Sequence, residues 1–288
     1  MFILRLPSAI ILTSLILAGI YINGLTGKVI FTFIAMFFAF FAVLEFLDII
    51  SKVGRRSYII FTSLFSAAAV FLLVAMRHRV TDLLVFEVRI MIVFAVIAWI
   101  LVLFSKNRED VLDKVLNSVS AFFLITLPLS FMIIIYLIDD GTRDAAGRKL
   151  LLYFIAVTKS GDIGAYLIGV TSSKLMPGGN HKIVPSISPK KSWEGTIGGL
   201  IFSIVVAIYL AKILPAPYKL AMPSAVMIGS ILFIGGFLGD LAESSLKRIA
   251  AVKDSGMIIP GIGGILDLLD SLILNAPIFY IFLIPMMR

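Results

Sequence analysis

The sequence predicts an all-α, polytopic membrane protein. Apolar residues make up 60% of the 288, charged residues make up only 15%, and the mean hydropathy is +1.09. These values lie far outside the range of soluble domains. Runs of about 20 apolar residues, long enough to cross roughly 30 Å of hydrocarbon, recur along almost the whole chain. Most of the chain is therefore expected to fold within the membrane.

About nine transmembrane helices are expected from these runs. The first run has the length of a signal peptide, but no small-residue cleavage site follows LILAGIYING and further spans come at once, so we expect a retained helix. The candidate spans are 6–22, 29–50, 58–76, 86–104, 118–138, 150–170, 196–213, 221–239 and 264–286.

The distribution of Lys and Arg between the spans predicts the orientation. With a cytoplasmic N-terminus, the larger share of the 25 basic residues falls on the cytoplasmic side. This favours a multi-pass protein of the cell (inner or plasma) membrane. The net charge of +8 and the pI of about 9.7 are attributed to contact with anionic lipid headgroups. Nucleic acid is not an expected partner, because the basic residues are scattered between spans.

Residue types exclude several kinds of site. The chain has no cysteine, which removes disulfides, thiolate nucleophiles and iron–sulfur clusters. Its two histidines, His78 and His181, lie far apart in the sequence. A metal site ligated by His or Cys is therefore not predicted.

The chain is expected to divide near residue 150, into N-terminal transmembrane helices (1–150) and a C-terminal catalytic transmembrane region (151–288). The first part contains few charges within its spans. Four of them are expected to lie near helix ends, where their side chains reach the membrane interface. These are Glu45, Asp48, Glu87 and Arg89.

The sixth predicted span carries two charges near its middle. Lys159 and Asp162 are three residues apart in LLLYFIAVTKSGDIGAYLIGV (150–170), so they share one helical face. A charge at membrane depth is costly and marks a candidate functional site. The alternative is an ion pair with a purely structural role.

The longest polar connection, residues 172–199, is expected to be a cytoplasmic loop. Its three prolines and the pair Gly178 and Gly179 interrupt any helix. Taken alone, it is equally consistent with an ordinary basic loop that faces lipid headgroups. Its lysines are Lys174, Lys182, Lys190 and Lys191.

Acidic residues pair at the end of the eighth span and the start of the ninth. Asp240 and Glu243 are three apart, as are Asp267 and Asp270, so each pair shares a helical face. Like charges this close favour a bound cation. Oxygen ligands without His or Cys indicate Mg²⁺ rather than zinc. The alternative is an acidic and basic loop pair balanced by salt bridges.

Basic residues and glycines lie between the acidic pairs. Lys247 is four residues beyond Glu243, and the glycines of PGIGG permit close backbone approach to a ligand. Such a set suits phosphate chemistry, with Mg²⁺ bridging phosphoryl oxygens and cations holding the others. No Walker A motif or Rossmann glycine pattern is present. The further members of this set are Arg248, Lys253, Asp254, Gly261, Gly263 and Gly264.

These residues form the pattern S-x-L-K-R-x4-K-D-S-G-x3-P-G-x-G-G-x-L-D-x2-D-S over residues 244–271. The pattern resembles the signature of the phosphatidate cytidylyltransferases, also called CDP-diacylglycerol synthases. Two further segments are similar to segments of that family in the same order, GDIGAYLIG (161–169) and SPKKSWEGTIGG (188–199). The likeness covers about residues 155–275, whereas the N-terminal half matches in hydropathy alone.

The resemblance implies that CTP and phosphatidic acid react to give CDP-diacylglycerol and pyrophosphate, with membrane lipids around the enzyme. It implies Mg²⁺ as cofactor, with one or two ions left open, and Asp240, Asp267 and Asp270 as ligands. Glu243 and Asp254 are either ligands or groups behind the ligands. The implied phosphate-binding residues are Lys191, Lys247, Arg248 and Lys253, and the implied substrate-binding residues are Lys159, Asp162, Ser188, Lys190, Gly261, Gly263 and Gly264.

Two positions depart from the family pattern. Ile262 stands where the family usually has His between the glycines, and Leu268 stands where Arg usually follows the first closing Asp. Nucleotidyl transfer is still expected because the carboxylates and the Lys-Arg pair remain. An altered lipid acceptor, slower turnover or an inactive relative stays open.

Two other functions fit parts of the sequence. A CTP-dependent membrane kinase for polyprenol-type lipids would use the same groups but release CDP. A lipid or ion transporter would place charges along a path through the bilayer. A homodimer is a further expectation, because the glycine pairs at 195 and 199 and at 235 and 239 permit close helix packing within or between subunits.

Overall fold

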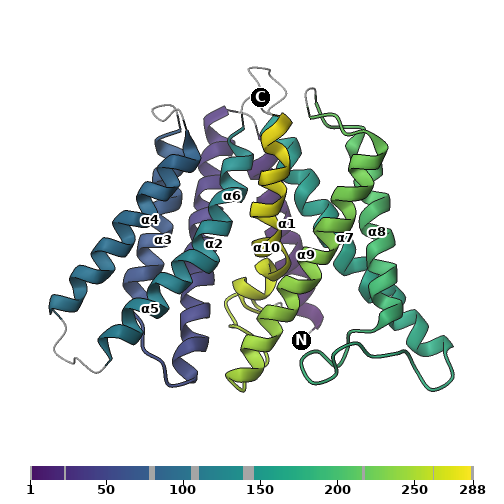
Figure 1. Cartoon of the computed structure of the whole chain (residues 1–288). Coiled ribbons are helices and arrows are strands. Elements are labelled where there is room, and N and C mark those ends of the chain that lie inside the picture. Colours follow the sequence, from purple (N-terminus) through teal and green to yellow (C-terminus); the bar gives the residue numbers. More distant parts are fainter. Residues whose placement is uncertain are drawn as a thin grey trace. The chain divides into compact units, whose positions relative to one another are not determined.

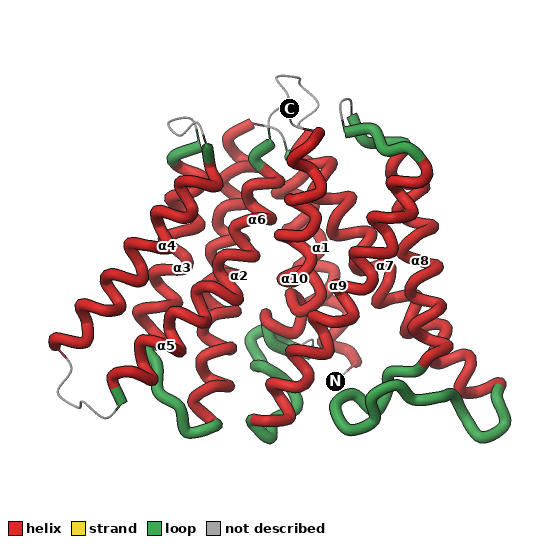
Figure 2. Tube along the Cα trace, in the orientation of Figure 1, coloured by secondary structure: helices red, strands yellow, loops and turns green. Residues whose placement is uncertain are grey.

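A computed structural model of the chain describes most of its length. All regular elements within the described part are helical, in agreement with the all-α prediction, and two isolated β-bridges join Lys182 to Ser192 and Ile259 to Gly263. Figures 1 and 2 show the helices and their connecting loops. The described residues are 2–22, 24–77, 82–104, 110–138, 146–215, 218–261 and 263–286.

Ten α-helices follow one another along the described segments. A short 3-10 turn extends α4 over Leu101–Phe104, one π-helical turn, Phe122–Thr126, joins α5 to α6, and a 3-10 turn at Ile284–Met286 follows α10. The helices are α1 (Phe2–Tyr21), α2 (Gly24–Lys52), α3 (Ile59–Ala75), α4 (Leu83–Ile100), α5 (Val111–Ala121), α6 (Leu127–Tyr136), α7 (Ala146–Leu175), α8 (Trp193–Ala211), α9 (Met222–Ile249) and α10 (Ile265–Leu283).

Every predicted span overlaps a helix, and the predicted span 118–138 falls on the continuous stretch from α5 through α6. Seven of these helical stretches are long and apolar enough to cross a membrane. The two others are shorter apolar helices, Ile10–Tyr21 and Ile59–Ala75. A multi-pass protein is thus supported, while the count of nine spans and the cytoplasmic orientation stay predictions.

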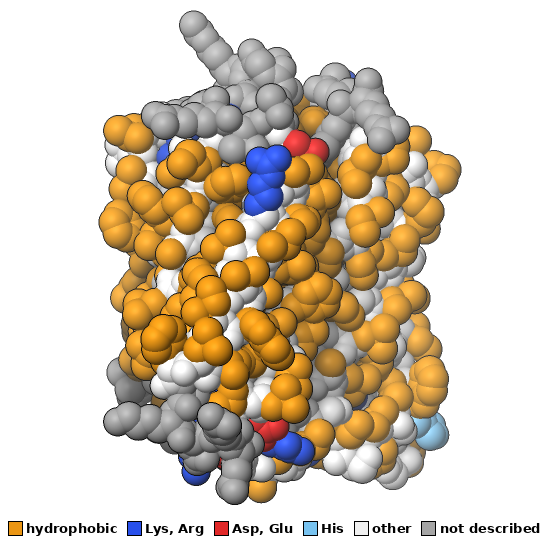
Figure 3. All heavy atoms as spheres, turned by 60° about the vertical axis from the view of Figure 1, so that its left-hand side comes forward, with side chains coloured by type: hydrophobic (Ala, Val, Ile, Leu, Met, Phe, Trp, Pro, Cys, Tyr) orange, Lys and Arg blue, Asp and Glu red, His pale blue; other side chains and the backbone are white. Residues whose placement is uncertain are grey.

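Large apolar side chains cover much of the molecular surface. On the face drawn in Figure 3, hydrophobic side chains form a broad band, and charged groups lie near its two ends. Tyr166, Val205 and Leu103 are among the exposed apolar residues. Such a surface would drive association in water, but it is suited to lipid.

The chain forms two compact units. The N-terminal unit comprises Met1–Leu137 together with Ile249–Leu269, and the C-terminal unit comprises Ile138–Arg248 together with Asp270–Arg288. The second unit starts at Ile138, whereas the division expected near residue 150 stays a prediction. The segment 249–269, however, belongs with the N-terminal helices, and α10 begins in one unit and continues in the other.

Two of the charges expected at the membrane interface are instead buried in the N-terminal unit. Glu45 is 2% exposed and Glu87 is 0% exposed. Ser130 Oγ donates to Glu87 Oε1 at 2.8 Å, so a side chain of α6 replaces the water that the interface would have supplied. Asp48, by contrast, forms a partly exposed ion pair with Lys52 at 2.6 Å.

Glycines bring α7 and α8 into close contact in the C-terminal unit. The two helices run side by side (Figure 1). At Gly199 an added Cβ would lie 2.5 Å from the Phe233 ring and 2.7 Å from the Gly161 carbonyl oxygen. Gly195 likewise lies against the Ala165 carbonyl oxygen. The glycine pair 195 and 199 therefore serves packing within one chain.

We expect Gly199→Ala to lower the thermal unfolding midpoint of the detergent-solubilised protein, because the new methyl group collides with backbone as well as with Phe233. Overpacking of this kind costs about 1–3 kcal/mol. The matched control is Gly169→Ala on α7, where the nearest atoms to an added Cβ lie at an ordinary 3.7 Å. Equal midpoints for the two variants would contradict this account of the helix contact.

Candidate active site

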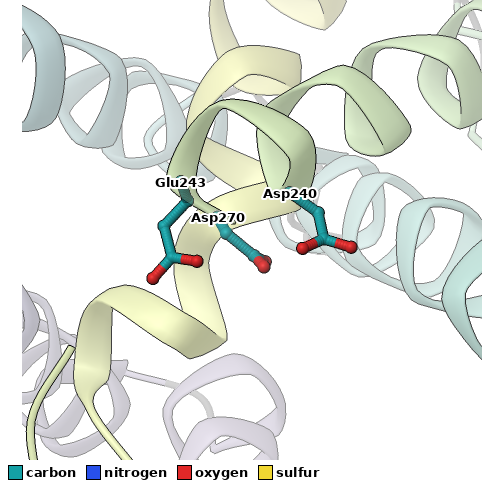
Figure 4. A group of neighbouring side chains, drawn as sticks. All are labelled: Asp240, Glu243 and Asp270. Carbon is teal, nitrogen blue, oxygen red and sulfur yellow. The ribbon is translucent and has the colours of Figure 1, made fainter. Parts of the chain in front are cut away.

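Three carboxylates of the C-terminal unit converge, and we call them the acidic cluster: Asp240 and Glu243 of α9 and Asp270 of α10. One oxygen from each lies within 4.8 Å of the others. Figure 4 shows the Asp270 carboxylate between those of Asp240 and Glu243. Glu243 is 8% exposed, and the other two are half-buried. Such a density of negative charge requires nearby cations or donors.

A lysine pairs with each member of the acidic cluster. Lys191 Nζ lies 2.9 Å from Asp240, Lys247 Nζ lies 2.5 Å from Glu243, and Lys159 Nζ lies 3.7 Å from Asp270. These lysines come from the loop before α8, from α9 and from α7. Three separate elements thus supply the countercharge, so the cluster depends on the tertiary structure of the unit.

Close approach of α9 and α10 makes the acidic cluster possible. A Cβ at Gly239 would collide with the Asp270 carbonyl oxygen, and one at Gly235 would collide with the Asn275 side chain. Asn275 Nδ2 donates to the Leu232 carbonyl oxygen at 2.6 Å, which fastens the same pair of helices. The second glycine pair noted in the sequence, 235 and 239, therefore also packs within the chain.

The acidic cluster fits a hard divalent cation. All its donors are oxygen, the type that Mg²⁺ and Ca²⁺ prefer. Ligand oxygens of one octahedral Mg²⁺ lie about 3 Å apart when adjacent and about 4.2 Å apart when opposite, given the usual metal–oxygen distance. The three carboxylates already lie within 4.8 Å of one another. This limit is close to the separation of oxygens on opposite sides of one such ion.

Lys159 and Asp162 join the same site rather than forming an isolated pair. Their side chains lie 3.3 Å apart. Lys159 Nζ also donates to Ser271 Oγ at 2.7 Å, and Ser271 Oγ donates to Asp162 at 3.0 Å. The sequence pattern alone gives Ser271 no role. Its place at the end of the signature pattern, next to Asp270, was the available signal.

The basic loop between α7 and α8 is shorter than the predicted 172–199, because α7 continues to Leu175 and α8 begins at Trp193. The loop is tied to both helices. Asn180 Nδ2 donates to the Gly169 carbonyl oxygen at 2.9 Å and to Ser192 Oγ at 3.0 Å. Ser192 in turn caps α8 by accepting from Gly195 N at 3.2 Å. These bonds give the loop a defined path (Figure 2).

Lys191 has a fixed position at the end of this loop. Its ammonium donates to the Phe237 carbonyl oxygen at 3.2 Å and lies 4.1 Å from the centre of the Phe237 ring. Arg248 Nε donates to the Ile187 carbonyl oxygen at 3.2 Å, which links the end of α9 to the loop. The neighbouring Ser188 is half-buried, and Lys190 is exposed.

The remaining predicted site residues belong to the N-terminal unit. Lys253 and Asp254 are exposed, and Gly261 and Gly263 adopt the positive φ angles of +79° and +127° that favour glycine. Ile262 lies outside the described residues. Leu268, the second residue that departs from the family pattern, is half-buried in the first turns of α10.

Asp267 differs from the other predicted ligands in its contacts. Its Oδ2 accepts from Ser255 N at 3.1 Å and from Gly264 N at 3.0 Å, so it caps the start of α10. The carboxylates that converge are Asp240, Glu243 and Asp270, all in the C-terminal unit. A role of Asp267 as metal ligand stays a prediction.

The chain is similar to two staphylococcal proteins over most of its length. It is 34% identical over 251 residues to the phosphatidate cytidylyltransferase of Staphylococcus haemolyticus (strain JCSC1435), covering 87% of this chain and 90% of that protein. It is 32% identical over 260 residues to the enzyme of the same name from Staphylococcus aureus (strain COL), covering 90% and 92%.

A third similar protein shares a shorter region. "Uncharacterized protein YnbB" of Escherichia coli (strain K12) is 39% identical over 142 residues, which are 49% of this chain and 45% of that protein. This chain therefore aligns with less than half of the length of that relative. The match to the cytidylyltransferase family, however, extends over residues 3–285, nearly the whole sequence. The chain belongs to the cytidylyltransferase family.

Proposed function

We propose that this protein is a magnesium-dependent phosphatidate cytidylyltransferase. The observation that carries the proposal is the acidic cluster with its three lysines, gathered from α7, α9, α10 and the loop before α8. Carboxylates for a divalent ion and ammonium groups for phosphate oxygens are what nucleotidyl transfer requires. The two staphylococcal relatives, similar over about nine-tenths of their length, carry this name.

In the proposed reaction, a phosphate oxygen of phosphatidic acid attacks the α-phosphorus of CTP. The new phosphorus–oxygen bond forms as the bond between the α-phosphorus and the bridging oxygen breaks, and pyrophosphate leaves. The products are CDP-diacylglycerol and pyrophosphate. No covalent intermediate with the protein is needed, so its residues position the substrates and stabilise charge.

Asp240, Glu243 and Asp270 would hold the magnesium ion in this proposal, with Asp267 or a second ion as further candidates. Bound Mg²⁺ offsets the charge that develops on the phosphoryl oxygens. The observed lysine pairs offset the negative charge of the three carboxylates. CTP would bring its own negative charge, and the lysines would then turn to its phosphates.

Lys191 and Lys247 are assigned to the CTP phosphates, together with Arg248 and Lys253. Lys191 is the best supported of these, because its ammonium contacts the ring and the carbonyl oxygen of Phe237 and pairs with Asp240 of the acidic cluster. Lys159, Asp162 and Ser271 form a hydrogen-bonded group beside Asp270. We assign this group to the phosphate of the acceptor lipid.

The proposed site faces the cytoplasm from the cell membrane. Support comes from the excess of Lys and Arg expected on that side of the spans, including Lys174, Lys182, Lys190 and Lys191. CTP is water-soluble, whereas phosphatidic acid stays in the bilayer. A polar cluster at the end of apolar helices suits both substrates.

Product analysis tests the proposed function. Purified protein given Mg²⁺, radiolabelled CTP and phosphatidic acid is expected to form a CDP-lipid and one pyrophosphate for each CTP consumed. Release of CDP with a phosphorylated polyprenol would show a lipid kinase instead. Absence of any CDP-lipid over a range of acceptor lipids and ions would contradict the assignment, as would transport of ions or lipid without consumption of CTP.

Metal binding can be measured without turnover. We expect Asp240→Asn and Asp270→Asn each to weaken Mn²⁺ binding by about tenfold or more, because each removes a charged oxygen ligand. Asp48→Asn is the matched control, since Asp48 pairs with Lys52 at the end of α2 and lies outside the acidic cluster. Titration of free Mn²⁺ by electron paramagnetic resonance gives the affinities. Unchanged affinity in both cluster variants would place the ion elsewhere.

The variant Asp267→Asn distinguishes two roles of Asp267, metal ligand and helix cap. The Asn carbonyl oxygen can still accept from Ser255 N and Gly264 N, so capping and thermal stability should persist. If Asp267 ligates the ion, we expect turnover to fall by at least about a hundredfold. Wild-type turnover in this variant would limit Asp267 to the capping role.

A further inference from the structure

A buried carboxylate from the N-terminal half of the chain contacts the signature segment. Glu45, near the end of α2, accepts hydrogen bonds at Oε2 from Leu266 N at 2.8 Å and from Ser255 Oγ at 3.0 Å. Ser255 is itself 2% exposed. These contacts lie within the N-terminal unit and join residues more than 200 positions apart in the sequence.

Two signature glycines pack directly on this carboxylate. An added Cβ at Gly256 would collide with Glu45 Oε1, and one at Gly264 would collide with Glu45 Oε2 and Ser255 Oγ. Neither glycine has a positive φ angle. Glycine is therefore needed at these positions for space around Glu45 rather than for backbone conformation.

Glu45 and Asp267 together satisfy the backbone at the start of α10. The first amides of a helix have no partner within the helix. Here Leu266 N donates to Glu45, and Gly264 N donates to Asp267. Two carboxylates at one helix N-terminus are also favoured by the helix dipole. The path of the loop and the start of α10 thus depend on Glu45.

The start of α10 matters because this helix carries Asp270. Leu266 precedes Asp270 by four residues, about one helical turn, so a shift of the first turn moves Asp270 with it. The loop held by Ser255 also carries Lys253 and Asp254. We infer that Glu45 is a positioning residue for the cytidylyl transfer, which fixes the signature loop and the first turn of α10. This inference rests on the proposed function.

Glu87 provides a matched comparison within the same unit. It is as deeply buried as Glu45 and also accepts from a serine, Ser130 Oγ at 2.8 Å. Glu87 lies on α4 and Ser130 on α6. A second polar contact in this unit is the 2.6 Å hydrogen bond between the hydroxyls of Ser66 and Thr126. Replacing Glu87 therefore removes an equally buried carboxylate that accepts from α6, whereas Glu45 accepts from the signature segment.

Three variants of the full chain test the role of Glu45. Glu45→Met keeps length but removes the acceptor, and we expect kcat/KM for CTP to fall about a hundredfold. Glu45→Gln keeps an acceptor oxygen for Leu266 N and Ser255 Oγ, and it should stay within about threefold of wild type, because Glu45 acts through geometry. Glu87→Met should leave kcat and KM unchanged even if it lowers the unfolding midpoint.

Hydrogen exchange measured by mass spectrometry gives a readout independent of turnover. In Glu45→Met, peptides covering 253–267 should exchange faster than in wild type and in Glu87→Met. If wild-type protein makes no CDP-lipid, the proposed function fails while this exchange result still tests the contact. Unchanged exchange, wild-type kinetics in Glu45→Met, or equal kinetic losses in Glu45→Met and Glu87→Met would overturn the inference.

A variant on the loop side covers the case in which Glu45→Met does not fold. Gly256→Ala introduces a methyl group whose nearest atoms all belong to Glu45. We expect it to lower kcat/KM and to speed exchange over 253–267, and the shorter side chain of Glu45→Asp should relieve part of that loss in the double variant. Additive losses in the double variant would contradict the inference.

Discussion

Buried carboxylates constrain this structure more than any other feature. A carboxylate inside an apolar helix bundle is costly unless a cation or a hydrogen-bond donor compensates it. The chain uses three kinds of compensation. Lysines face the acidic cluster, a serine donates to Glu87, and backbone amides together with Ser255 donate to Glu45 and Asp267. Apart from the Lys247–Glu243 pair, which lies within α9, each of these contacts joins two elements.

Glycines determine how closely the carboxylates can approach the groups that compensate them. On α9, Gly235 and Gly239 let α10 approach until Asp270 reaches Asp240 and Glu243. On the signature loop, Gly256 and Gly264 leave space for the Glu45 carboxylate. Larger side chains at these positions would separate the charged groups from their partners. These four glycines therefore determine the distances between charged groups and their partners as well as the packing of the helices.

The signature segment serves both units of the protein. Its beginning, in α9, and its end, at Asp270 and Ser271, belong to the C-terminal unit, whereas residues 249–269 fold with the N-terminal helices. One continuous sequence motif is therefore divided between the two units. The N-terminal half is expected from the sequence to match the family in hydropathy alone, but the family match extends over residues 3–285 and so includes it. This half supplies through Glu45 the acceptor that orders the middle of that motif.

The sequence by itself determined that the protein is helical and rich in membrane-spanning segments, and the spacing of its residues determined that Asp240 and Glu243 share one helical face. These are local properties, because hydropathy and helical periodicity act over a single helix. Only the tertiary structure decided that Asp270 joins that pair, that lysines from other elements face it, and that Glu45 is buried against Ser255. Such contacts join positions far apart in the chain, and they depend on which helix faces pack together.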